Sequence, residues 1–188
     1  FRSQTVATNV FRYFIKDYPT SKLSNEARQL LSTLLENAQN YKDAQQILEG
    51  IANKTPELNR AYQRVLYYRG VEFYNEQNPD SAFAYFDKAI KLPMSADVVA
   101  LSHFWRGNIL YKKKEFKAAV TELTEYLRNA GEATVSDKVS GATAKYTIGY
   151  AYFKLKDYKQ AQRYFDESVA NLKEQQLIAN PKSVSGQI

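Results

Sequence analysis

The sequence predicts an all-α fold made of stacked pairs of antiparallel helices, and three observations predict it. The 188-residue chain repeats one motif at intervals of 37 to 42 residues, and periods of this size are typical of helical repeat proteins. The apolar residues of the motif follow helical spacing, and no segment alternates apolar and polar residues over the length of a strand. An apolar content of 44% is sufficient for a packed core.

The motif is clearest in three segments that align on a glycine. In each segment an alanine follows the glycine by twelve residues, and a large apolar residue follows the alanine by four. Because glycine and alanine have minimal side chains, two helices that carry them can approach closely, while the apolar residue fills the adjoining layer one turn further on. The glycines are Gly70, Gly107 and Gly149, the alanines are Ala82, Ala119 and Ala161, and the apolar residues are Phe86, Leu123 and Phe165.

A fourth copy precedes these three, with Ser32 in the place of the glycine. Ala44 and Leu48 follow it at the spacings just described, and a proline at position 56 closes the copy. We expect residues 1–19 to be the second helix of a truncated repeat, in a chain that is a piece of a longer protein. The intervals between the alanine, the apolar residue and the proline recur there, at Ala7, Phe11 and Pro19.

This pattern resembles the tetratricopeptide repeat family, whose unit is a helix, a turn and a second helix. The resemblance implies a tetratricopeptide-repeat right-handed α-solenoid of stacked helix hairpins over residues 1–188. Its four full repeats satisfy the need of each hairpin for neighbours that cover its apolar face. Full repeats are expected at 25–58, 63–96, 100–133 and 142–175, and residues 176–188 either start a further repeat or form a flexible tail.

The residue types needed for catalysis and metal binding are scarce. The chain has no cysteine and a single histidine, His103, so a histidine-based catalytic site or zinc site lacks members. The seven glycines form no phosphate-binding loop. We therefore predict a protein that is not an enzyme and carries no cofactor, and we expect His103 to have a structural role.

Two arginines break the pattern of the family. Arg69 and Arg106 directly precede repeat glycines, where the family usually has leucine. Because an arginine can bury its aliphatic stem and still place its guanidinium at an edge, we expect each to pack and to meet a carboxylate, such as Glu72 or Glu76. Direct contact with a ligand is the alternative.

The first helices of the repeats line a concave groove in proteins of this family. Positions −3, +1, +4 and +5 from the glycine share one helical face, and seven of the twelve residues at these positions are aromatic. Aromatic rings give rigid contact area in recognition surfaces, but they are equally suited to a core, and both interpretations stay open. The predicted groove residues are Tyr67, Val71, Tyr74, Asn75, Phe104, Asn108, Tyr111, Lys112, Tyr146, Tyr150, Phe153 and Lys154.

The predicted function is a non-catalytic scaffold that binds a protein or an extended peptide along this aromatic groove. Family members that clamp a partner's terminal carboxylate use Lys, Asn and Arg at set positions, which here hold other residues, such as Gln29, Thr33 and Tyr68. A helical-repeat RNA-binding protein is the alternative. The net charge of +6 is small, because 20 acidic residues are mixed with the 26 basic ones. We therefore do not expect nucleic acid to bind.

The location is predicted from one phrase. Residues 17–27, DYPTSKLSNEA, resemble an inter-repeat phrase of bacterial envelope tetratricopeptide proteins, including outer-membrane assembly lipoproteins and periplasmic cell-wall coordinators. The resemblance implies a periplasmic or outer-membrane-associated protein of a bacterium and is compatible with a larger envelope complex. A cytoplasmic location is the alternative. No apolar run approaches the roughly 18 residues that a membrane span requires.

Overall fold

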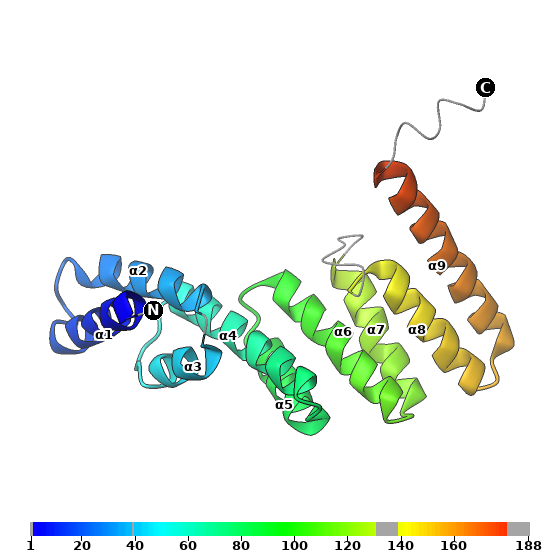
Figure 1. Ribbon diagram of the computed structural model, residues 1–188, viewed down its shortest axis with the longest axis horizontal. Helices are drawn as coiled ribbons and strands as arrows, with labels where there is room; N and C mark the ends of the chain where they lie inside the picture. Colours follow the sequence, from blue (N-terminus) through cyan, green and yellow to red (C-terminus); the bar gives the residue numbers. More distant parts are fainter. Residues whose placement is uncertain (1, 39, 131–138, 180–188) are drawn as a thin grey trace. The chain divides into compact units, whose positions relative to one another are not determined.

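The computed structural model describes residues 2–38, 40–130 and 139–179, and this part of the chain is all-α, as predicted, with no β-strand (Figure 1). The repeats appear as helical pairs joined by short turns. The helices are α1 (Arg2–Asp17), α2 (Ser24–Glu36), α3 (Tyr41–Glu49), α4 (Pro56–Asn75), α5 (Pro79–Ile90), α6 (Ala96–Lys112), α7 (Phe116–Ala130), α8 (Gly141–Lys154) and α9 (Tyr158–Ala179).

The chain divides into two compact units. Unit 1 is Phe1–Val99 and unit 2 is Ala100–Ile188, so the boundary falls in the first turn of α6. Helix α4 begins at Pro56, ahead of the predicted repeat start at residue 63, because the Thr55 hydroxyl accepts a hydrogen bond from the Leu58 N–H and Pro56 suits the first helical turn. Residues 176–179 continue α9, while residues 131–138 and 180–188 lie outside the described residues.

Unit 1 is built on leucines and valines that face inward from α2, α3 and α4. Leu31, Leu48, Leu58 and Val65 are fully buried in one cluster. Burial of each such side chain contributes about 1.5–3 kcal/mol. The amide nitrogen of the buried Gln63 donates to the Ala89 carbonyl at 3.0 Å, which ties α4 to the end of α5.

Unit 2 has an aromatic core between α6, α7 and α8. Phe104 and Tyr126 are buried there with their ring centroids 5.1 Å apart, in an edge-to-face arrangement. Ile148 of α8 closes the same cluster. The second hairpin of the unit is tied by Ser168 of α9, whose buried hydroxyl donates to the Ala142 carbonyl at 2.8 Å.

The repeat glycines make the close contacts that the motif predicted. A Cβ added at Gly70 would lie 2.7 Å from the Phe86 ring, and one at Gly107 would lie 2.6 Å from Leu123 Cγ. In each case the partner is the apolar residue of the same motif, sixteen residues on. The large side chain therefore packs directly on the glycine of its own hairpin.

The same type of turn joins the helices in three hairpins. Gln77, Lys114 and Lys156, each seven residues after a repeat glycine, have positive φ angles of 59°, 65° and 64°. The residue after each of them donates its backbone N–H to the carbonyl five positions back, at 2.9–3.0 Å. This is a Schellman motif, and glycine is the residue that usually occupies its left-handed position.

Candidate functional site

Two of the predicted groove residues lie in the core. Tyr67 is 9% exposed and its ring packs 5.8 Å from that of Phe86, while Phe104 is only 2% exposed. Their burial corrects the expectation that position −3 faces the groove, because Phe104 is covered by Tyr126 and by Ile148 of the next first helix. Tyr146, at the same position in α8, is 51% exposed.

The other predicted groove residues reach solvent to different extents. Among the described side chains, the half-buried members are Val71, Tyr74, Asn108 and Tyr111, and the exposed ones are Asn75, Lys112, Tyr146, Tyr150, Phe153 and Lys154. The Asn108 amide donates to the Phe104 carbonyl of its own helix at 2.9 Å, which leaves only part of its polar group for a ligand.

Four exposed aromatic side chains of unit 2 lie on α8 and at the start of α9. We name Tyr146, Tyr150, Phe153 and Tyr158 the aromatic row; their exposed fractions run from 38% to 60%. The Tyr146 hydroxyl donates to that of Tyr150 at 3.4 Å, and this hydrogen bond raises the pKa of Tyr146. Four large rings at a surface are therefore available to a partner.

Contacts below the aromatic row hold its rings in place. The Phe165 ring lies 5.8 Å from Tyr146 and 5.1 Å from Tyr150, and Phe153 lies 5.6 Å from Tyr158. Phe165 also packs on Gly149. Because these rings are already restrained, a partner that contacts them loses little further side-chain entropy.

Lysines surround the turns at the same end of unit 2. Helices α6 and α8 both run toward this end, so the α6–α7 and α8–α9 turns lie at one edge (Figure 1). Between residues 111 and 118 and between 153 and 160, seven exposed lysines accompany two acidic residues, Glu115 and Asp157. We name these lysines the basic edge: Lys112, Lys113, Lys114, Lys117, Lys154, Lys156 and Lys159.

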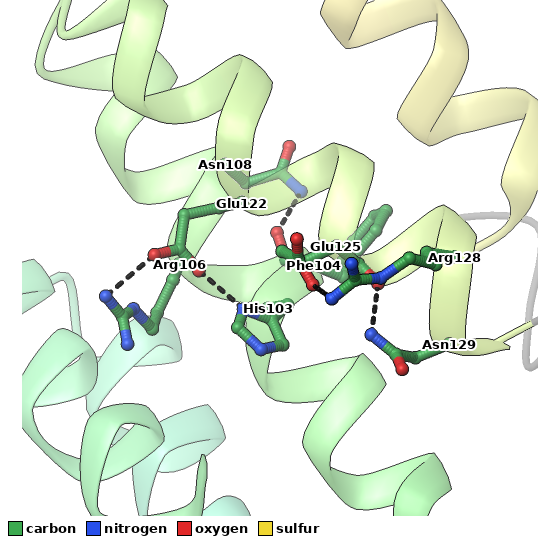
Figure 2. A network of polar contacts seen from close by, with 8 residues as sticks. All are labelled: His103, Phe104, Arg106, Asn108, Glu122, Glu125, Arg128 and Asn129. Atoms are coloured by element: carbon green, nitrogen blue, oxygen red, sulfur yellow. Dashed lines mark hydrogen bonds and ion pairs between the residues drawn. The ribbon is translucent and has the colours of Figure 1, made fainter.

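A polar network links α6 to α7 (Figure 2). One carboxylate oxygen of Glu122, on α7, lies 2.7 Å from His103 Nδ1. The other oxygen lies 2.7 Å from Arg106 Nη2. The three side chains are only 14–17% exposed. Figure 2 shows Glu122 between the two α6 residues, so His103 takes part in a contact between helices, in agreement with the structural role expected for it.

Arg69 behaves as expected in unit 1. Its guanidinium lies 2.5 Å from the Glu72 carboxylate and 4.6 Å from the centre of the Phe73 ring. Arg106, in contrast, reaches across to α7 and Glu122. Both arginines therefore pair with a carboxylate, one within its helix and the other between helices.

Metal chemistry has no visible site in the described part of the chain. Within residues 2–38, 40–130 and 139–179, no group of three or more His, Asp or Glu side chains is placed to hold a metal ion. In those stretches, no helix combines the length and the apolar character that crossing a membrane requires.

Comparison with known proteins identifies the repeat. A family profile described as tetratricopeptide repeat matches residues 142–170, which cover α8 and the first half of α9. Residues 142–170 therefore match a tetratricopeptide repeat. No curated protein matches the chain.

Solved structures share the helical-repeat fold of this chain. A crystal structure of MamA matches with a TM-score of 0.53 and 15% identity, over 89% of this chain and 88% of MamA. A second MamA structure matches with a TM-score of 0.52 and 15% identity, over 99% of this chain and 87% of that one. BtubC (BKLC) from P. vanneervenii matches with a TM-score of 0.56 and 15% identity, over 92% of this chain and 72% of BtubC.

The basic edge escaped the sequence-based prediction, although a signal for it exists. Lysine occurs at +5, +7 and +10 from Gly107 and again from Gly149. Around Gly70 the same positions hold Asn75, Gln77 and Asp80. The register of the repeat thus distinguishes the turns of unit 2 from the equivalent turn of unit 1, whereas a search for runs of lysine detects only residues 112–114.

Proposed function

We propose that this protein is a non-catalytic scaffold that binds an extended, acidic segment of a protein partner on unit 2. The observation that carries the proposal is the exposed aromatic row of α8 and α9, with the basic edge at the adjoining turns. The tetratricopeptide fold supports a scaffold in general.

The aromatic row supplies the area for binding. Tyrosine and phenylalanine bury large surfaces with few rotatable bonds, and such residues dominate the energy of protein interfaces. Tyr146 and Tyr150 also keep hydroxyl groups at the surface that can bond a peptide backbone. Tyr111 lies close enough to influence the Tyr146 hydroxyl electrostatically, so α6 adds to the same surface.

The basic edge supplies the preference for acidic partners. Each exposed ion pair contributes at most about 1 kcal/mol, so the lysines act mainly on the rate of association and on the choice of partner. Of seven lysines, Lys114, Lys154 and Lys156 belong to or adjoin the turns themselves, where their side chains extend into solvent. We therefore expect alternating acidic and apolar residues in the bound segment.

Selection from a random peptide library tests this function. We expect peptides enriched against the whole chain to combine Asp or Glu with apolar residues, and to lose binding to a Tyr146→Ala/Tyr150→Ala variant. Tyr18→Ala is the matched control, because Tyr18 is a similarly exposed tyrosine, at 60%, in unit 1 and outside any proposed site. Equal binding by all three proteins contradicts the proposal.

The same variants distinguish a protein partner from the RNA alternative. A protein that neutralises several phosphates loses affinity steeply with salt. We expect single-stranded RNA to bind weakly and to dissociate at physiological salt. A tight RNA complex at that salt, weakened by Tyr150→Ala, favours the RNA-binding alternative over a protein partner.

We also propose a location in a bacterial envelope, on the resemblance of residues 17–27 to the inter-repeat phrase of envelope proteins. This stretch contains the end of α1, the turn and the start of α2. Fractionation of the native cells with an antibody against the chain tests the location, and recovery in the cytoplasmic fraction contradicts it.

A further inference from the structure

A second site lies in unit 1, far along the sequence from the aromatic row. A cavity of about 730 Å³ opens between the end of α1, the start of α2 and the connection from α3 to α4. This volume is within the range of small-molecule sites, which is about 300–1,000 Å³. The cavity is therefore large enough for an organic ligand.

The charges around this cavity have one sign. Arg12, Lys16 and Arg28 contribute to its lining, and no carboxylate does. Arg12 and Lys16 are four residues apart on α1, where like charges face each other and are unfavourable. An anion between these groups would remove that repulsion.

The three cations have no carboxylate partner among the residues that the structure describes. Arg28 Nη1 donates to the Asn53 carbonyl at 3.4 Å, which is a long hydrogen bond. The Arg12 guanidinium lies over the Tyr13 ring at 5.0 Å from its centre. Both guanidinium groups therefore keep donors for a stronger acceptor, and guanidinium groups bind phosphate oxygens in pairs.

Apolar groups complete the lining. Tyr13, whose side chain is 54% exposed, and Ile51 both line the cavity. A bare oxyanion would contact only the cations and would leave most of the space to water. The mixed lining fits a ligand that has one anionic end and one apolar end.

We propose that this cavity binds a small organic phosphate. Arg12, Lys16 and Arg28 bind its phosphoryl group, and the apolar remainder lies against Tyr13 and Ile51. A phosphate monoester carries a charge of about −1.5 to −2 at neutral pH. This charge is closer to the total charge of the three cations than the single charge of a carboxylate is. The site is independent of the function proposed for unit 2.

Calorimetric titration of the whole chain with phenyl phosphate, at constant ionic strength, tests the site. We expect phenyl phosphate to bind at least about tenfold more tightly than inorganic phosphate, and phenol not to bind; a tenfold change corresponds to about 1.4 kcal/mol. Equal affinity for phenyl phosphate and inorganic phosphate, or no heat from either at millimolar concentration, overturns the proposal.

Variants locate the binding within the cavity. We expect Lys16→Gln and Arg28→Gln each to weaken phenyl phosphate binding about tenfold, as loss of a charge-assisted contact predicts, and Tyr13→Ala to abolish the preference over inorganic phosphate. Lys22→Gln is the control, because Lys22 is exposed on the α1–α2 turn outside the lining. Lys16 and Tyr13 are exposed, so their variants keep the fold, which the helical melt verifies. Unchanged binding by these variants overturns the proposal.

Discussion

Gly149 and Phe165 pack so closely that a Cβ on the glycine would lie 2.7 Å from the phenylalanine ring. The same ring supports Tyr146 and Tyr150 of the aromatic row. The contact that closes the last described hairpin therefore also sets the position of the proposed binding surface.

Gly149→Ala should destabilise unit 2 by about 1 to 3 kcal/mol, because the added methyl group displaces a packed ring. Gly141→Ala is the matched control in the same helix, since its nearest atom would be Leu127 Cδ2 at an ordinary 3.8 Å. Urea denaturation followed by circular dichroism measures both. A Gly149→Ala variant as stable as Gly141→Ala shows that the ring moves without cost.

Lys156→Gly should stabilise the α8–α9 turn by about 0.5 kcal/mol. The left-handed conformation destabilises a residue that has a side chain by about 1–2 kcal/mol, and glycine avoids this cost. Glycine in turn lowers stability by about 0.4–1 kcal/mol, because it gives the unfolded chain more conformational entropy. Lys154→Gly, two residues earlier and still helical, should instead destabilise. Thermal melts of the two variants should shift in opposite directions, and a shared direction contradicts the role of the turn.

Glu122→Gln should cost about 1 to 3 kcal/mol. Removal of one partner from a fully buried ion pair costs about 3–5 kcal/mol, and the partial exposure of this network reduces the figure. Glu125→Gln, on the same helix, breaks only an exposed pair with Arg128 and should cost less than about 1 kcal/mol. Denaturation midpoints compare the two, and equal losses would mean that the Glu122 contacts add nothing.

Tyr150→Ala and Phe104→Ala should separate the two kinds of predicted groove residue. Truncation of the buried Phe104 should cost about 3–5 kcal/mol, whereas truncation of Tyr150, which is 38% exposed, should cost much less. The melting temperature measures both effects. A large loss for Tyr150→Ala would place that ring among the packing residues and weaken its assignment to the binding surface.

Stability should fall at high pH. Burial, followed by a hydrogen bond with Glu49, raises the pKa of Tyr62 to about 12, and burial also raises the pKa values of Tyr41, Tyr126 and Tyr152. Because folding favours the protonated phenols, their contribution is complete below the ordinary pKa of about 10 and is lost as the pH rises toward 12. Denaturation midpoints measured from about pH 9 to 12 show this loss of stability. The loss should be smaller in the Tyr62→Phe variant. A midpoint of the unsubstituted protein that stays constant over this range contradicts the prediction.

The repeat positions could be predicted from the sequence because each is local to one hairpin. Gly107 and Leu123 touch as their spacing implied. The burial of Phe104 could not be predicted, since it depends on Tyr126 and Ile148 of other helices, while Tyr146 at the same position is exposed. Offsets within a repeat carry no information about which neighbour is present.

Some contacts between helices follow the repeat spacing and others do not. Glu122 meets Arg106 sixteen residues away, which is also the separation of Gly107 from Leu123, and it meets His103 as well. The cavity of unit 1 brings together α1, α2 and a connection near Asn53. Such groupings depend on how the loops close, which residue spacing alone does not determine.

The glycine contacts also bear on how such a chain changes its length in evolution. Each glycine and its apolar partner belong to one hairpin, as in Gly70 with Phe86 and Gly107 with Leu123. Duplication or deletion of one whole period leaves every remaining pair complete, and in repeat proteins stability is nearly a sum over units and their neighbours. Hairpins of this kind can therefore be inherited as interchangeable modules, and the surfaces that they carry, such as the aromatic row, can diverge one at a time.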